Sequence, residues 1–197
     1  AVEANNKYTS TPASLTINID GSRIYGDTND TSDYNYSAAS GLKTWDQTKF
    51  NNVGWDDLTV NNTSDVLDDV NSYTGKLSLD ATSKNTVSTG LTNNYNITYT
   101  DSFAINKADL TYVAKGTRVY GEANSTSGED YSFTFDGLKN GQTIDGDKLT
   151  VTNNTSIQAN AGSNQTVASA SGFKASGSTG FKESNYNIST VEASNKY

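Results

Sequence analysis

Two stretches of the sequence, "SLTINIDGSRIYGDTN" (residues 14–29) and "DLTYVAKGTRVYGEAN" (residues 109–124), align without a gap. Tyr25-Gly26 in the first stretch matches Tyr120-Gly121 in the second, at an offset of 95 residues. An internal repeat of this kind determines the architecture of the whole chain. The first inference is therefore that one structural module occurs twice.

Later segments repeat in the same order. The stretch "LTVNNTS" (58–64) returns as "LTVTNNTS" (149–156), and "NYNI" occurs at 94–97 and again at 185–188. A module of 90 to 95 residues is long enough to fold without metals or disulfides. We therefore predict module one at residues 14–106 and module two at residues 107–197.

A longer repeat joins the two ends of the sequence. "VEANNKY" (2–8) and "VEASNKY" (191–197) agree at six of seven positions and lie 189 residues apart. We interpret the sequence as one period of a tandem array, in which residues 1–13 are the tail of the preceding repeat and a linker. In such an array we expect each copy to be a monomer.

The pattern within each module is typical of strands. In "SLTINI" (14–19) and "DYSFTF" (130–135), apolar and polar residues alternate, which places one set in a core and the other in water. The only candidate for a helix is a short one at 64–73. We predict a mostly β fold of two homologous modules placed end to end in an elongated rod.

The composition limits the functional classes. Only 33% of the residues are hydrophobic, yet 12 Tyr, 6 Phe and 2 Trp indicate a folded chain and not a disordered one. The net charge of −8 disfavours binding to nucleic acid. No run approaches the roughly 20 apolar residues of a membrane span, so no membrane insertion is expected. Without His or Cys, common general bases and thiol nucleophiles are missing, and we expect no enzymatic activity.

The repeated motifs resemble a known family. "RIYGD" and "RVYGE", each followed by an aromatic strand, a "GL" turn and a terminal "NYNI" strand, resemble the MBG-type modules (YGX class) of bacterial surface adhesins, related to lactobacillal mucus-binding repeats. The resemblance implies β-grasp-like modules on an exported protein of the bacterial cell surface or cell wall. An immunoglobulin-like sandwich fits the strand pattern nearly as well.

The same resemblance implies adhesion as the function. The expected partners are host glycans, mucin or an extracellular-matrix protein, bound through many weak contacts along the array. The alternative is a spacer that binds nothing itself and projects a separate adhesive domain.

An insertion in module one supplies the candidate binding residues, because Lys43 and Leu58 are further apart than their counterparts in module two. Its aromatic residues could form a platform for a sugar face, and its polar residues could bond to hydroxyl groups. The alternative is that the tryptophans cap the module's core, so the exposure of Trp45 and Trp55 discriminates between the two. The candidate set is Trp45, Asp46, Gln47, Phe50, Asn51, Asn52 and Trp55.

The repeated residues are interpreted as scaffold. Tyr25-Gly26 and Tyr120-Gly121 are predicted to form turns in which glycine adopts a conformation that other residues resist. Arg23 and Arg118 recur with them, and we expect each to make a structural ion pair or a carbonyl contact.

An acidic segment of module one suggests calcium as a possible cofactor. The segment 27–33 offers Asp27, Asn29, Asp30 and Asp33, and calcium binds six to eight such oxygens. A solvated acidic turn has the same composition, and module two retains only part of the set.

Overall fold

The computed structural model describes residues 8–29, 34–162, 167 and 169–191. The chain is mostly β, with several small sheets, as the alternating pattern predicts. It divides into two compact units. Unit 1 holds the described residues of Ala1–Arg23, Thr28–Asp65 and Asn71–Ile105, and unit 2 holds those of Ile24–Asp27, Val66–Val70 and Asn106–Tyr197.

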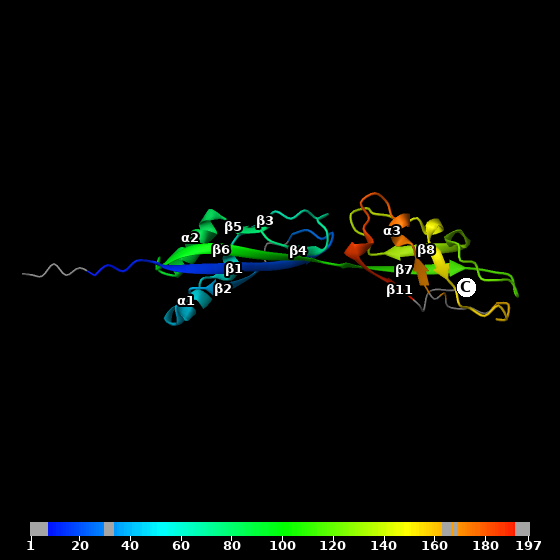
Figure 1. Ribbon diagram of the computed structural model, residues 1–197, viewed down its shortest axis with the longest axis horizontal. Coiled ribbons are helices and arrows are strands. Elements are labelled where there is room, and N and C mark those ends of the chain that lie inside the picture. The colour runs from blue at the N-terminus through cyan, green and yellow to red at the C-terminus, as the bar shows by residue number, and fades with distance from the viewer. Residues whose placement is uncertain (1–7, 30–33, 163–166, 168, 192–197) are drawn as a thin grey trace, which may run out of the picture. The chain divides into compact units, whose positions relative to one another are not determined.

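Unit 1 is built on a four-stranded sheet of order β2-β1-β6-β4. Its strands are β1 (Ala13–Ile24), β2 (Tyr34–Ser40), β4 (Asn71–Tyr73) and β6 (Tyr95–Asn106). β1 pairs antiparallel with β2, and β4 pairs antiparallel with β6. β1 and β6 lie side by side (Figure 1), and side-chain hydrogen bonds join Thr16 to Thr98 and Thr100 to Asn18. Residue numbers rise together along both strands, so β1 and β6 run parallel.

The core of unit 1 follows from the alternation along these strands. The inward apolar residues of β1 and those near the two ends of β6 are almost completely buried, and a two-stranded sheet of β3 (Val60–Asn62) and β5 (Leu77–Leu79) adds further apolar residues. Three short helical turns follow β2: η1 (Thr44–Asp46), α1 (Gln47–Asn51) and η2 (Trp55–Asp57). The buried apolar residues of β1 and β6 are Leu15, Ile17, Ile19, Tyr95, Phe103 and Ile105.

The helix α2 (Ala81–Gly90) also belongs to unit 1. The Asp80 carboxylate accepts a hydrogen bond from the Ser83 backbone N–H at 2.7 Å, an N-cap that satisfies one of the free donors at the start of the helix. Val87 is fully buried and holds the helix against the core. The helix proposed from sequence at 64–73 is absent, since this segment forms turns and then β4.

Unit 2 is built around a three-stranded sheet of order β11-β7-β8. Its strands are β7 (Ala108–Gly116), β8 (Tyr131–Asp136) and β11 (Tyr186–Thr190). β7 pairs antiparallel with β8 and parallel with β11. A second pair consists of β9 (Thr150–Thr152) and β10 (Ser169–Ser171), and the helical turns are η3 (Gly128–Asp130), η4 (Gly146–Lys148), α3 (Phe173–Ser176) and η5 (Glu183–Asn185).

An equivalent side-chain hydrogen bond occurs within each of the two units. In unit 1 the Asn62 amide donates to the Tyr34 hydroxyl at 3.1 Å, and in unit 2 the Asn153 amide donates to the Tyr131 hydroxyl at 3.0 Å. The repeated asparagine and tyrosine thus form the same hydrogen bond in both units. In the described part of the chain, no helix is long and apolar enough to cross a membrane.

Truncating a buried side chain on the central strand of unit 2, β7, should strongly lower the stability of the chain. The substitution Leu110→Ala should lower the free energy of unfolding by about 2–5 kcal/mol, because Leu110 is fully buried on β7 and its truncation leaves a cavity. Leu67→Ala is the matched control, since this leucine is 54% exposed, and it should change stability by no more than about 0.5 kcal/mol. Urea denaturation of both variants measures the difference, and equal losses would contradict the assigned core.

Candidate functional site

Two of the predicted platform residues lie in an aromatic cluster of unit 1. The Trp55 ring stacks on Tyr36 with centroids 4.7 Å apart and lies 4.8 Å from the Phe50 ring. The Trp55 indole N–H donates to the Phe50 carbonyl at 2.8 Å, and Phe50 itself is only 6% exposed. Burial, with the neighbouring Tyr34 and Asp56, raises the pKa of Tyr36 to about 12. Phe50 therefore offers almost no surface to a ligand.

Trp45 has a different environment. Its side chain is 77% exposed on η1, and it lines an open hollow of about 460 Å³. Asp46, Lys43, Asn94 and Tyr95 line the same hollow, together with Ser10, Thr11, Pro12, Ala13 and Asn93. We call this site the Trp45 hollow. Of the predicted binding set, Trp45 and Asp46 are the two that line it.

The floor of the Trp45 hollow is a hydrogen-bonded group. The Asp46 carboxylate, 3% exposed, accepts from the Lys49 ammonium at 2.7 Å and from the Tyr95 hydroxyl at 2.8 Å. Both bonds lower the pKa of Asp46 below its usual value, and the bond from Lys49 has the larger effect. The Tyr95 hydroxyl in turn accepts the Lys43 backbone N–H at 3.1 Å, and burial raises the pKa of Tyr95.

The remaining polar candidates lie on or beside α1. The Gln47 amide donates to the Asn51 side chain at 2.9 Å, and Gln47, Asn51 and Asn52 are all exposed. They do not line the Trp45 hollow. The predicted set is thus split between the hollow, the aromatic cluster and the α1 surface.

Unit 2 has an equivalent of this floor. The Tyr186 hydroxyl accepts the Lys139 backbone N–H at 3.0 Å and donates to the Gln142 side-chain oxygen at 2.5 Å. The Gln142 amide then donates to the Tyr25 hydroxyl at 2.9 Å. Here a first tyrosine loop, Ile24–Asp27, occupies the site.

This first tyrosine loop is tightly packed. Tyr25 is 1% exposed, and its ring meets the Tyr186 ring edge-on at 5.5 Å. The Asp27 carboxylate forms an ion pair with the Lys139 ammonium at 2.8 Å. A Cβ placed on Gly26 would lie 2.5 Å from the Cβ of Lys139, so the backbone of the loop lies directly on that side chain.

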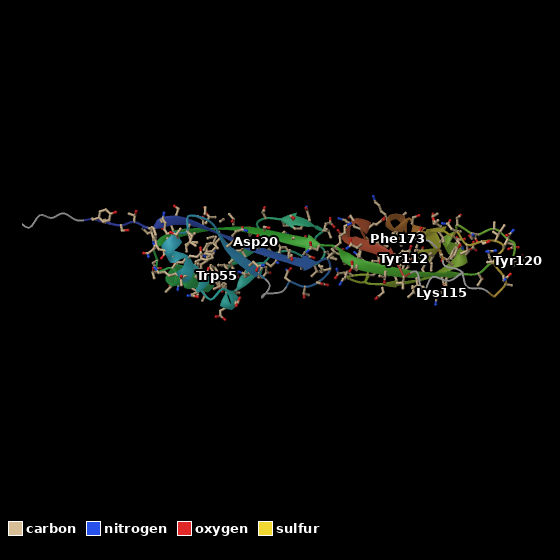
Figure 2. All side chains as sticks on the ribbon, turned by 90° about the horizontal axis from the view of Figure 1, so that it is seen from below. Asp20, Trp55, Tyr112, Lys115, Tyr120 and Phe173 are labelled. Carbon is tan, nitrogen blue, oxygen red and sulfur yellow. The ribbon has the colours of Figure 1, made fainter. Side chains whose placement is uncertain are left out.

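The second tyrosine loop, residues 119–122, has the same turn but does not pack into such a site. We call the site that can receive a tyrosine loop, formed in unit 2 by Lys139, Gln142 and Tyr186, its seat. The Glu122 N–H donates to the Val119 carbonyl at 3.1 Å, as the Asp27 N–H donates to the Ile24 carbonyl at 3.2 Å. The glycine after each tyrosine has a positive φ angle, +83° in this loop and +81° in the first. Tyr120, however, is 61% exposed, and Figure 2 shows it at the end of unit 2, away from Tyr112 and Phe173.

The two repeated arginines bind backbone carbonyl groups. Arg23, 8% exposed, donates to the Asn29 side-chain oxygen at 3.0 Å and to the Asp65 carbonyl. Arg118 donates to the carbonyls of Ser156 and Ile157. Each arginine thus joins the chain at the end of β1 or just after β7 to a later loop of the same unit.

The predicted calcium ligands are partly placed. Asp27 is paired with Lys139, and the Asn29 side chain is bonded to Arg23 and Ser64. Asp30 and Asp33 lie outside the described residues. Within the described ranges, no three acidic side chains gather closely enough to hold a metal ion.

Comparisons with family models, with curated proteins and with solved structures found no match for this chain. Sequence reasoning did not select Lys43, Tyr95, Lys139, Gln142 or Tyr186 as site residues. Four of these residues lie in two motifs that the sequence repeats: the lysines in "GLK" and the tyrosines in "NYNI".

Matched glycine substitutions separate the two tyrosine loops. Gly26→Ala and Gly121→Ala each place a Cβ at positive φ, which costs about 1–2 kcal/mol. Only Gly26→Ala also forces a methyl group into the Lys139 side chain, and this overpacking should cost about 1–3 kcal/mol more. Chemical denaturation of both variants measures the difference. Equal destabilisation would show that the first tyrosine loop is not seated.

The Asp46 carboxylate predicts a pH effect. Its folded-state pKa is lowered, so its bonds stabilise the fold above the unfolded pKa of about 4, and this contribution is lost as the pH falls through the folded value. Asp46→Asn should therefore destabilise the chain more at pH 7 than at about pH 2.5. Urea unfolding at both pH values measures this, with Asp57→Asn as the control for the loss of one exposed carboxylate. A difference independent of pH contradicts the assignment.

Proposed function

We infer that the chain is a structural repeat of a long bacterial surface protein, which acts as a spacer holding a separate adhesive domain away from the cell. The observation that carries this is the use of the repeated side chains. Both arginines bind backbone carbonyls, and Asn29 and Asn124 each donate to a carbonyl of the loop that follows β3 or β9. The repeated arginines and asparagines are thus occupied in forming the modules.

The strand order supports a β-grasp-like module. In each unit the first strand of the module pairs with the second on one side and with the last on the other. In unit 2 the first and last strands run parallel, with a register from Ala108–Tyr186 to Tyr112–Thr190. An immunoglobulin-like sandwich is built from antiparallel sheets packed face to face. The parallel central pair therefore favours the β-grasp over the sandwich.

The proposed location follows from the resemblance and from the surface chemistry. Copies of a chain with a net charge of −8 repel one another. Because the chain has no cysteine, it cannot form adventitious disulfides. Both properties suit a densely displayed extracellular array. Each copy then contributes length, and no cofactor is needed.

Direct adhesion is the second candidate, and Trp45 is the observation that favours it. An indole that is 77% exposed beside a hollow with hydrogen-bonding groups provides a surface on which a sugar ring can stack. In an array, such weak contacts would gain about 10² to 10⁴ in avidity.

A multivalent binding measurement distinguishes the two functions. Beads displaying many copies of the chain should adhere to mucin, host-glycan and matrix surfaces no better than beads displaying Trp45→Ala. The exposed position of Trp45 means that this variant should fold normally, which thermal unfolding checks. Adhesion of the wild type that is lost in folded Trp45→Ala would overturn the spacer and establish the second candidate.

A further inference from the structure

The two units differ in whether their seat for a tyrosine loop is filled. Unit 2 contains both a seat and the first tyrosine loop that fills it, since Ile24–Asp27 belongs to that unit. Unit 1 contains the equivalent seat, the Trp45 hollow, which no described residue fills. The second tyrosine loop, around Tyr120, is exposed.

The correspondence between the filled and open seats extends to individual groups. Lys43 and Lys139 occupy equivalent positions, because each donates its backbone N–H to the tyrosine that begins the last strand of its module. Asp46 and Gln142 are equivalent, because each accepts from the hydroxyl of that tyrosine.

One asparagine shows the difference between the two seats. Asn185, in unit 2, is 1% exposed and binds the Asp69 carboxylate and the Val70 N–H. Its counterpart in "NYNI" of unit 1 is Asn94, which is exposed and lines the Trp45 hollow. The same position is therefore covered by a neighbouring segment in one unit and open in the other.

The two loops correspond as closely. Their glycines share one backbone conformation, and the acid after each glycine is Asp27 in one loop and Glu122 in the other. A Cβ on Gly121 meets nothing within 4 Å, whereas one on Gly26 collides with Lys139. The second tyrosine loop therefore has the shape of a seated loop without the contacts of one.

We propose that the Trp45 hollow is the docking site for the second tyrosine loop of another copy of this chain, namely the copy that precedes it in the array. The proposal rests on the tandem arrangement inferred above. The charges match, since Glu122 would face Lys43 as Asp27 faces Lys139. The hydrogen bonding matches as well, because the Asp46 carboxylate can accept from the Tyr120 hydroxyl where Gln142 donates to that of Tyr25.

Trp45 has a defined place in this contact. It lies two residues after Lys43, and unit 2 has Gly141 at the equivalent position, two residues after Lys139. A Cβ on Gly141 meets nothing within 4 Å although the seat of unit 2 is filled, so space remains beside this position when a loop is seated. The indole would cover the docked Tyr120 ring and bury apolar surface on both.

The contact is heterologous, because the loop and the hollow are different surfaces. Heterologous contacts form closed rings or open filaments, and along a tandem array this one would propagate from copy to copy in one direction. Linking the copies raises the effective concentration of the loop to the millimolar range, so a small interface suffices within one chain.

A two-copy chain tests the proposal. Tyr197 of the first copy is joined directly to Thr9 of the second, which preserves the 189-residue period. In ¹⁵N NMR spectra, the Trp45 indole N–H and the Lys43 and Tyr95 amides should each give two signals of equal intensity, one for the open hollow of the first copy and one for the filled hollow of the second. Tyr120→Ala in the first copy should reduce the docked fraction at least about tenfold and merge the signals.

Charge exchange provides the matched control. Lys43→Glu in the second copy should lower the ratio of docked to open forms about two- to fivefold, and Glu122→Lys in the first copy should restore it. Lys115→Glu, an exposed charge on β7, should leave the ratio unchanged. A single set of signals that coincides with those of the 197-residue chain would overturn the docking. That result leaves the spacer function standing, since the bead measurement tests it separately.

Discussion

One tyrosine hydroxyl group organises the end of each unit, namely that of Tyr95 at the start of β6 and that of Tyr186 at the start of β11. Tyr95 and Tyr186 each accept the backbone N–H of the lysine in "GLK" and donate to the side chain three residues after that lysine. Burial raises the pKa of both phenols, so both stay protonated and able to donate. This bond fixes the position of the turn against the last strand, and in unit 2 the first tyrosine loop packs against that turn.

The partner of that hydroxyl differs between the modules, and the difference sets the chemistry of each seat. Gln142 can accept and donate at once, so it relays the bond from Tyr186 to Tyr25. Asp46 can only accept, and its charge is balanced by Lys49. A buried carboxylate without such a partner would be costly, which explains why a lysine lies three residues after Asp46.

The β-rich character and the alternating core of β1 could be predicted from the sequence, because these depend on local periodicity. The helix α2 could not, since "ATSKNTVSTG" has no apolar stripe and the helix depends on the Asp80 cap and the burial of Val87. The separation of Trp45 from Trp55 was equally unpredictable. Spacing places both rings on one insertion, but the contact with Tyr36 that holds Trp55 comes from a different strand.

The parallel pairing of β7 with β11 determines how a module resists mechanical force. Tension along the chain enters at the start of β7 and leaves at the end of β11, and these two points lie at opposite ends of one strand pair. The hydrogen bonds between Ala108–Gly116 and Tyr186–Thr190 are therefore loaded in shear, all together, and do not open one at a time. Forced unfolding is governed by the unfolding rate, so a unit of modest thermodynamic stability can remain folded under a load applied along this strand pair.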